Sequence, residues 1–227
     1  MTMIFLCLAG TLLNITISRL SFLSGIPLYL DTILTISVTL TGGVLCGAVC
    51  AALTNIIYHT LWGYGWEGYL FAVCNIATAF ITWLFIRIFP GELDLPQKKP
   101  LNNAGASVRS SLIGIIMDRV IVLIIFSFAL CLGMSFLGGF IATVIILLDA
   151  SYIPSGSGIA ATFSTTMFKG NAPVIIAEIV SRIPVNIIDR LLSSFGGYGI
   201  ALCLYKVFCS KHRPRKDETA GDVIKTA

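Results

Sequence analysis

The stretch GGVLCGAVCAALTNII, residues 42–57, runs without a charged side chain. Small residues return every four positions along it: Gly43, Gly47, Ala51 and Asn55. Residues four apart lie on one face of an α-helix, and a stripe of small residues lets membrane helices approach one another closely. The stretch therefore predicts an apolar helix over residues 43–61 that packs against its neighbours through this face.

The composition of the whole chain supports the same interpretation. Of its 227 residues, 56% are hydrophobic and only 11% are charged. A water-soluble domain of this length carries more charge. In lipid only α-helices and closed barrels satisfy their backbone hydrogen bonds, and the apolar runs here are longer than the alternating strands of a barrel. The sequence predicts an all-α integral membrane protein.

The apolar runs predict a bundle of six transmembrane helices. They cover residues 4–20, 32–41, 43–61, 69–89, 110–132 and 185–208. The first run has no basic region ahead of it and is interpreted as a membrane helix, not a cleaved signal. The second is short for a hydrocarbon core of about 30 Å, so it must tilt or be flanked by protein. Residues 138–148 form a further apolar run that is either re-entrant or an outer amphipathic segment.

Basic residues predict the orientation of these helices. They occur between the fourth and fifth predicted helices and again after the last one: Lys98, Lys99, Arg109, Lys206, Lys211, Arg213, Arg215 and Lys216. The positive-inside rule places both groups in the cytoplasm, which requires an even number of spans between them. Both termini are then cytoplasmic. A six-helix domain, residues 1–209, is followed by a basic and then mixed-charge tail, residues 210–227.

A second stretch, IPLYLDTILTI at residues 26–36, holds a lone carboxylate, Asp31, with no basic neighbour. An unpaired charge in hydrocarbon is costly, so Asp31 should lie at a water-facing boundary or in a site. A carboxylate at a helix start can accept hydrogen bonds from free backbone N–H groups. We expect Asp31 to cap the second helix at its outer end, which leaves it able to contribute to a site.

Polar and aromatic side chains gather at this same predicted outer end. The third, fourth and sixth predicted helices and the segment LWGYGWEGY supply them: Asn55, Tyr58, His59, Trp62, Tyr64, Trp66, Glu67, Asn75, Asn186 and Asp189. Trp and Tyr also form interfacial belts in membrane proteins that bind no ligand. Arg190 should point about 100° away from Asp189 on the helix. Glu178 and Arg182 have the spacing of a helical ion pair and are expected to be a solvated lead-in.

Sequence signatures of chemistry are missing. There is no GxxxxGK phosphate loop, no HExxH motif, and no Ser–His–Asp arrangement that His59 or His212 could complete. Cys46 and Cys50 lie one helical turn apart, which favours apolar packing over a metal or redox pair. We therefore expect no enzyme activity, metal site, cofactor or nucleic-acid partner, and a concave site that binds without reacting.

Four stretches together resemble a known family: LAGTLLNI at residues 8–15, IPLYLDTILTI, GGVLCGAVCAALTNII, and RIPVNIIDRLL at residues 182–192. They are similar to the S components of energy-coupling factor (ECF) transporters, which are vitamin uptake systems of bacteria and archaea. The resemblance runs from the first to the sixth predicted helix and excludes the tail from Ser210. It implies an outward-facing vitamin pocket in a prokaryotic plasma membrane, with transport powered by a separate membrane coupling subunit and two ATPases.

The resemblance also implies roles for particular residues. The pocket would be lined by residues 28–31, 62–67 and 152–155, the last group including Tyr152, together with Asn75, Asn186 and Asp189. The family contacts its coupling subunit through an Ala-xxx-Ala pattern on the first helix, but here Ala9 is followed four positions later by Leu13. Gly10, Asn14 and Ser18 have the same spacing and can replace that pattern. Such a pocket suits a flat heteroaromatic vitamin or precursor and suits a strongly anionic one less well.

Two other functions are compatible with the same sequence. A membrane-embedded ligand sensor would act through a separate signalling partner, because the tail is too short to be an output domain. A lipid-modifying enzyme would need a reactive group near the headgroups, and Asp118 with Arg119 is the candidate on the cytoplasmic side.

Overall fold

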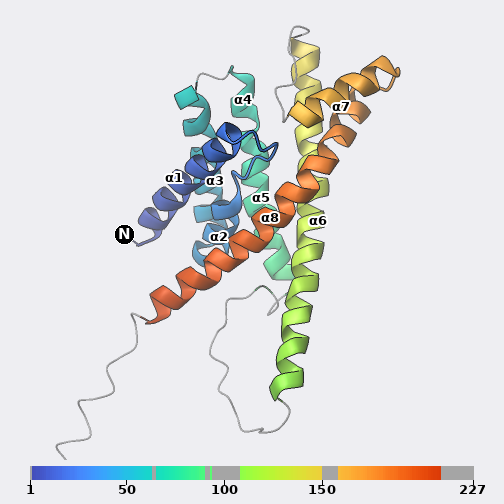
Figure 1. Cartoon of the computed structure of the whole chain (residues 1–227). Coiled ribbons are helices and arrows are strands. Elements are labelled where there is room, and N and C mark those ends of the chain that lie inside the picture. The colour runs from blue at the N-terminus through green and yellow to red at the C-terminus, as the bar shows by residue number, and fades with distance from the viewer. Residues whose placement is uncertain (1, 63–64, 90–92, 94–107, 150–157, 211–227) are drawn as a thin grey trace, which may run out of the picture.

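The computed structural model describes residues 2–62, 65–89, 93, 108–149 and 158–210, and every regular element in these ranges is a helix (Figure 1). In chain order they are α1 (Thr2–Leu23), α2 (Ile33–Gly42), α3 (Val44–Trp62), α4 (Glu67–Leu70), α5 (Ala72–Ile88), α6 (Val108–Leu148), α7 (Gly158–Lys169) and α8 (Val174–Ser210). The predicted all-α class is confirmed for these residues. The predicted tail, except Ser210, lies outside them.

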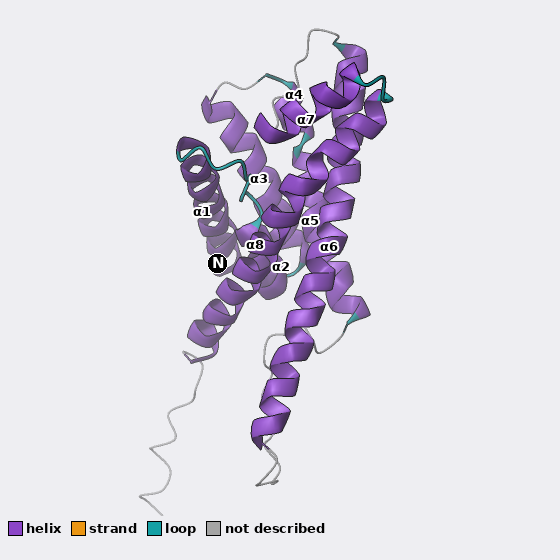
Figure 2. Ribbon diagram, turned by 45° about the vertical axis from the view of Figure 1, so that its right-hand side comes forward, coloured by secondary structure: helices purple, strands orange, loops and turns teal. Residues whose placement is uncertain are grey.

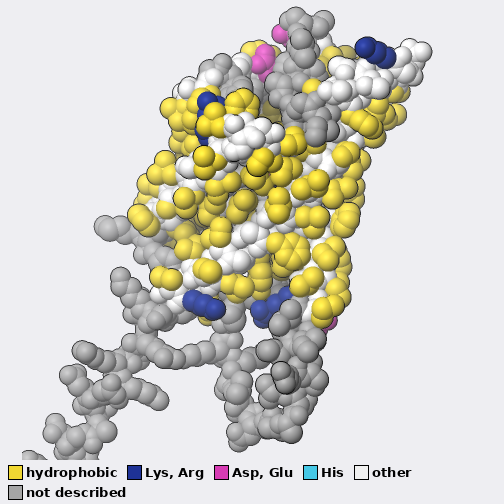
Figure 3. Space-filling model, viewed as in Figure 1, with side chains coloured by type: hydrophobic (Ala, Val, Ile, Leu, Met, Phe, Trp, Pro, Cys, Tyr) yellow, Lys and Arg dark blue, Asp and Glu magenta, His cyan; other side chains and the backbone are white. Residues whose placement is uncertain are grey.

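Five segments of the described chain are long and apolar enough to cross a membrane. They are Met3–Leu23, Val44–Trp62, Glu67–Ile88, Met117–Leu148 and Val174–Val207. The surface agrees with this assignment, because hydrophobic side chains cover the middle of the face in Figure 3, while Lys and Arg lie near its ends. Large apolar patches are rare on soluble monomers.

The short helix α2 occupies the centre of the bundle. It packs against α1, α3, α5 and α8, and the side chains from Leu34 to Thr39 are all buried. A helix of 10 residues is too short to cross hydrocarbon alone. The expectation that protein flanks it is confirmed.

The two long helices, α6 and α8, cross beside this group (Figures 1 and 2). In both views α4 and α7 lie at one end of the bundle, and α6 begins and α8 ends at the other. We call the first of these the α4–α7 end. The segment between α1 and α2 also lies there, because α1 ends and α2 begins at that end.

Two predicted helix boundaries are wrong. Residues 138–148 continue α6, and α8 begins at Val174 instead of at Pro184, which lies inside the helix. Gly138, Gly139 and Pro184 usually weaken helices, but in membrane proteins neighbouring helices support such positions. At Gly139 an added Cβ would lie 2.8 Å from the Ile179 Cα, so the glycine is needed for the close crossing of α6 and α8.

The small-residue stripe is internal within α3, at Gly47, Ala51 and Asn55, as predicted, whereas Gly43 precedes the helix and is exposed. A Cβ added at Gly47 would collide with Thr39 Oγ1 of α2 and would lie 3.2 Å from Ala79 Cβ of α5. Ala51 and Asn55, one and two turns further along, are also buried. The stripe therefore lets α2 and α5 approach the same helix.

Gly197 allows a second close approach, between α8 and α2, and this contact can be tested. A Cβ there would lie 2.7 Å from the Ile33 carbonyl oxygen and 2.9 Å from Ile36 Cβ. We expect Gly197→Ala to lower stability by about 1–3 kcal/mol, because backbone on both sides must move. The measurement is the thermal unfolding midpoint of the purified chain in detergent.

Gly199→Ala is the matched control for this prediction. No atom lies within 4 Å of its added Cβ, and alanine favours a helix over glycine by up to about 1 kcal/mol. Equal midpoints for the two variants would contradict the proposed approach of α8 to α2.

Candidate ligand-binding site

The helix α8 carries a row of buried polar side chains: Glu178, Arg182, Asn186 and Arg190, spaced every four residues, with Asp189 beside them. Glu178 and Asp189 are 0% exposed, Arg190 is 4% exposed and Arg182 is 7% exposed. Buried charges in an apolar bundle must find partners or be neutralised. The partners of this row identify the candidate site.

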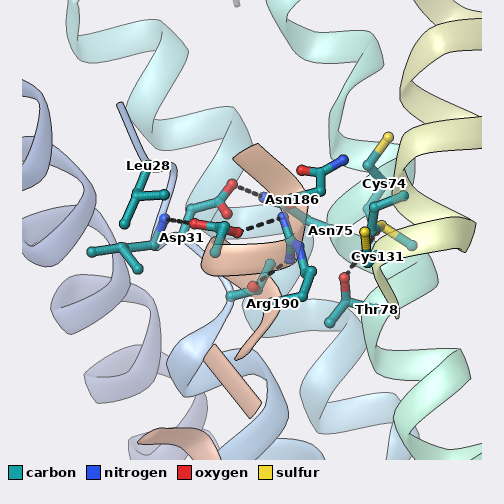
Figure 4. Close-up of polar contacts among 12 residues, drawn as sticks. Leu28, Asp31, Cys74, Asn75, Thr78, Cys131, Asn186 and Arg190 are labelled. Carbon is teal, nitrogen blue, oxygen red and sulfur yellow. Dashed lines mark hydrogen bonds and ion pairs between the residues drawn. The ribbon is translucent and has the colours of Figure 1, made fainter. Parts of the chain in front are cut away.

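The Asp189–Arg190 pair holds the segment that leads into α2 (Figure 4). Asp189 Oδ1 accepts a hydrogen bond from the Leu30 backbone N–H at 2.9 Å, and Oδ2 lies 3.1 Å from Arg190 Nη2. Arg190 Nη1 donates to Thr32 Oγ1 at 2.6 Å. Leu30 has φ of 48°, a left-handed conformation that residues with side chains rarely adopt. These bonds hold it there.

Arg190 does not point away from Asp189 as the helical geometry predicted. The backbone directions of adjacent residues do differ by about 100°, but the long arginine side chain can turn its guanidinium back. The resulting ion pair is buried on both sides. Arg190 is therefore part of the site, although the sequence indicated it only as a nearby cation.

Asp31 does not cap α2, so that prediction is wrong. Its Oδ2 accepts a hydrogen bond from Asn75 Nδ2 of α5 at 2.7 Å (Figure 4). Thr32 is the N-cap residue of α2 and makes no side-chain capping bond, because its hydroxyl accepts from Arg190. The carboxylate is thus turned toward α5. Its other oxygen, Oδ1, is buried and has no hydrogen-bond partner among the described residues.

Two further amides are buried in the bundle. Asn186 Nδ2 donates to Ser135 Oγ of α6 at 2.8 Å. Asn55 of α3 is 6% exposed, and its Oδ1 is buried without a hydrogen-bond partner in the described chain. Figure 4 shows Asn75, Asn186 and Arg190 near one another. The thiol of Cys131 on α6 donates to the Ile183 carbonyl oxygen of α8 at 3.8 Å.

Glu178 and Arg182 form the predicted ion pair, but they are not solvated. Arg182 Nη1 donates to the Glu178 carboxylate and, at 2.7 Å, to its backbone oxygen. Ser164 of α7 donates to the other Glu178 oxygen. The pair is buried because α7 packs on α8 and because Gly138 of α6 leaves room beside the Arg182 side chain.

The aromatic side chains at the end of α3 contact their neighbours. The rings of Tyr58 and Trp62 are 4.7 Å apart, and the Arg19 guanidinium of α1 lies 4.9 Å from the Trp62 ring. His59 lies 5.9 Å from the Tyr69 ring and against Gly68 of α4. These contacts join α1, α3 and α4. Aromatic residues of an interfacial belt in a membrane protein make contacts of the same kind.

Not every predicted site residue joins the cluster. Trp66 is 52% exposed, and Glu67 is half-buried in the first turn of α4. Tyr64 and Tyr152 lie outside the described residues. The structure therefore brings together Asp31, Asn75 and Asp189 through Arg190 and residues 30–32, with Asn186 beside them.

The residues predicted to contact a coupling subunit largely face the interior of the bundle. A Cβ on Gly10 would lie 2.9 Å from Val38 Cγ2 and 3.2 Å from Cys50 Sγ. Asn14 is fully buried; it donates to Thr35 Oγ1 at 3.2 Å and accepts from the Leu34 N–H at 2.8 Å. Both are thus engaged within the chain, while Ala9 and Ser18 are half-buried.

Several participants were not among the predicted site residues: Thr32, Ser135, Arg182 and Arg190. Leu30, which lies in the predicted 28–31 lining, takes part through its backbone N–H. The four-residue spacing of polar side chains along α8 was the available signal for the two arginines. Among the described residues no group of three or more His, Cys, Asp or Glu side chains could hold a metal ion. Comparisons with protein-family models, curated proteins and solved structures found no match to this chain.

The burial of the Glu178–Arg182 pair gives a prediction about stability. Arg182→Met should cost about 3–5 kcal/mol of unfolding free energy, because it leaves the Glu178 carboxylate buried without its cation. Adding Glu178→Gln should recover part of this loss, so that the double variant is more stable than Arg182→Met alone. The free energies can be measured by titrating detergent-solubilised chain with dodecyl sulfate.

Lys169→Met serves as the control, since Lys169 is an exposed cation at the end of α7. Its stability should stay within about 0.5 kcal/mol of the wild type. If Arg182→Met behaves like Lys169→Met, the pair is not buried as described.

Proposed function

We propose that this chain is the substrate-binding subunit, or S component, of an ECF-type importer. It would capture a vitamin or vitamin-like small molecule at the α4–α7 end and deliver it through a membrane coupling subunit driven by two ATPases. The observation that carries the proposal is the meeting of polar groups from the segment leading into α2, from α5 and from α8 inside an apolar bundle, with buried acceptor oxygens left unpaired among the described residues at Asp31 and, on α3, at Asn55.

The unpaired acceptors support a binding role. A buried oxygen without a donor costs about 1–3 kcal/mol, and few remain in native proteins without a reason. A ligand that donates hydrogen bonds would remove this cost on binding. Tyr58 and Trp62 lie further along α3 toward the α4–α7 end and offer ring faces for a flat molecule.

The direction of the helices also supports it. If α1, α2, α3, α5, α6 and α8 each cross the membrane once, both termini lie on one side. Basic residues near the end opposite α4 and α7 are Arg87 at the end of α5, Arg119 near the start of α6 and Lys206 near the end of α8. Arg19 and Lys169 lie toward the α4–α7 end, so the described basic residues favour a cytoplasmic location for the opposite end, and an outward-facing site, by three against two.

The coupling surface is proposed on the exposed face of α1. Gly10 and Asn14 are occupied within the bundle, whereas Phe5, Leu8 and Leu12 are exposed. They are spaced three and four residues apart and therefore share one face. An exposed apolar face on the first helix can pack against lipid or against a partner helix.

The binding role can be tested on the chain purified alone in detergent. We expect mass spectrometry of its extracted small molecules to find one enriched compound in a near-stoichiometric amount. Asn75→Ala should lower the affinity for that compound at least tenfold, about 1.4 kcal/mol, because it removes the side chain that orients Asp31.

Thr82→Ala provides the comparison on the same helix. Thr82 is buried on α5, but its hydroxyl bonds only to the Thr78 carbonyl of its own helix. The affinity of the Thr82→Ala variant for the extracted compound should equal that of the wild type. A folded wild-type chain with no enriched compound, or equal affinity in all three proteins, would contradict the proposal.

A further inference from the structure

We infer that the ligand carries a positively charged nitrogen and that Asp31 is its counter-charge. The inference deepens the proposed function and depends on it. It assigns a ligand class to the site from the charges and hydrogen bonds of the described residues.

The first step is the charge of the central cluster. It contains two carboxylates, Asp31 and Asp189, and one guanidinium, Arg190. Arg190 pairs with Asp189 at 3.1 Å, while Asp31 receives a hydrogen bond from the neutral amide of Asn75. The cluster therefore has one negative charge more than it has positive charges. Excess charge inside an apolar bundle is unfavourable unless a proton or a cation neutralises it.

No other described cation is placed to neutralise Asp31. Arg182 is paired with Glu178, so that cluster is neutral by itself. Arg19 lies over the rings of Phe22 and Trp62. The other Lys and Arg residues whose side chains are described make no ion pair with Asp31: Arg87, Arg119, Lys169 and Lys206. A proton, or a positive charge from outside the described side chains, must therefore neutralise Asp31, and a cationic ligand can supply that charge.

The second step is the position of the unpaired acceptors. Gly47 packs against Thr39 of α2, and α2 and α3 run antiparallel through the short connection at Gly43. Moving two turns from this contact reaches Asn55 on α3 and the Asp31 position just before α2. The unpaired Oδ1 atoms of both residues are thus at one level of the bundle.

These two oxygens define the chemistry of the ligand. Both accept hydrogen bonds and neither donates one, so the group that meets them is a donor, while the unpaired Arg190 Nε of the same cluster would take an acceptor of the ligand. A protonated amine supplies the donor and the charge together, and hydrogen bonds to charged groups are stronger than neutral ones. The aromatic rings at the end of α3 also favour a cation over an anion. An anionic ligand would add to the excess negative charge.

The test compares organic cations with neutral analogues of the same shape. The probes are benzylamine against benzyl alcohol, in which the charged nitrogen of the cation donates hydrogen bonds, and choline against 3,3-dimethylbutan-1-ol and 1-methylnicotinamide against nicotinamide, in which it does not. Each is added at millimolar concentration to the full chain in detergent at constant ionic strength, and the thermal unfolding midpoint is measured. We expect at least one cation to raise the midpoint and its neutral partner to have no such effect.

Asp31→Asn should abolish this preference, with at least a tenfold loss of affinity for the cation. Asn can still accept the hydrogen bond from Asn75, so the contact between α2 and α5 is retained. Asp118→Asn is the matched control, because it removes the same charge from an exposed position near the start of α6 and should keep the preference. Asn55→Leu is the second variant. It should lower the affinity for the cation severalfold without changing the charge of the protein.

Four results would overturn the inference. The first is that no cation is preferred over its neutral analogue. The second is that Asp31→Asn and Asn55→Leu, both folded, keep the preference. The third is that sodium chloride alone reproduces the shift, since the site then takes a monatomic ion. A neutral or anionic compound extracted from the purified chain would overturn the inference and leave the binding function intact, whereas finding no compound at all would count against the function itself.

Discussion

The buried Asp189–Arg190 pair is the interaction on which the candidate site depends. Asp189 fixes the backbone at Leu30 and Arg190 fixes Thr32, so the residue between them, Asp31, is directed toward Asn75 of α5. The pair thereby fixes the segment just before α2 and determines that the Asp31 side chain contacts Asn75. Breaking it would leave a buried charge and release a left-handed backbone conformation at the same time.

Glycines allow α8 to reach the residues that its charges hold. Gly197 lets α8 lie against the first turn of α2. Gly139 lets α6 approach the α8 backbone at Ile179. In a membrane, close helix contacts of this kind replace the hydrophobic effect as a source of stability, because lipid is as apolar as the side chains. The polar row of α8 and these two glycines therefore work together, because the polar side chains supply specific contacts and the glycines allow the short distances between helices.

The all-α class, the apolar helices and the need to flank α2 with protein could be predicted from composition and run length. So could the residues Asp31, Asn75 and Asp189, since an isolated polar group in an apolar run must find a partner. The partners themselves could not be predicted. Pro184 and Gly138 locally resemble helix boundaries, although tertiary contacts support a continuous helix. Glu178 and Arg182 resemble an exposed pair in the sequence, because their four-residue spacing does not show that α7 packs over them. That these residues bind a ligand stays a prediction.

Hydrogen–deuterium exchange at the Leu30 amide tests the central claim most directly. The account predicts that this amide, bonded to a fully buried carboxylate, exchanges as slowly as the amides of α2, although it lies outside any helix. Overlapping peptides that resolve Leu30 in the wild-type chain in detergent would show this. Exchange at the rate of an unprotected loop amide would contradict it, because Asp189 would then not hold the segment and Asp31 would have no fixed position.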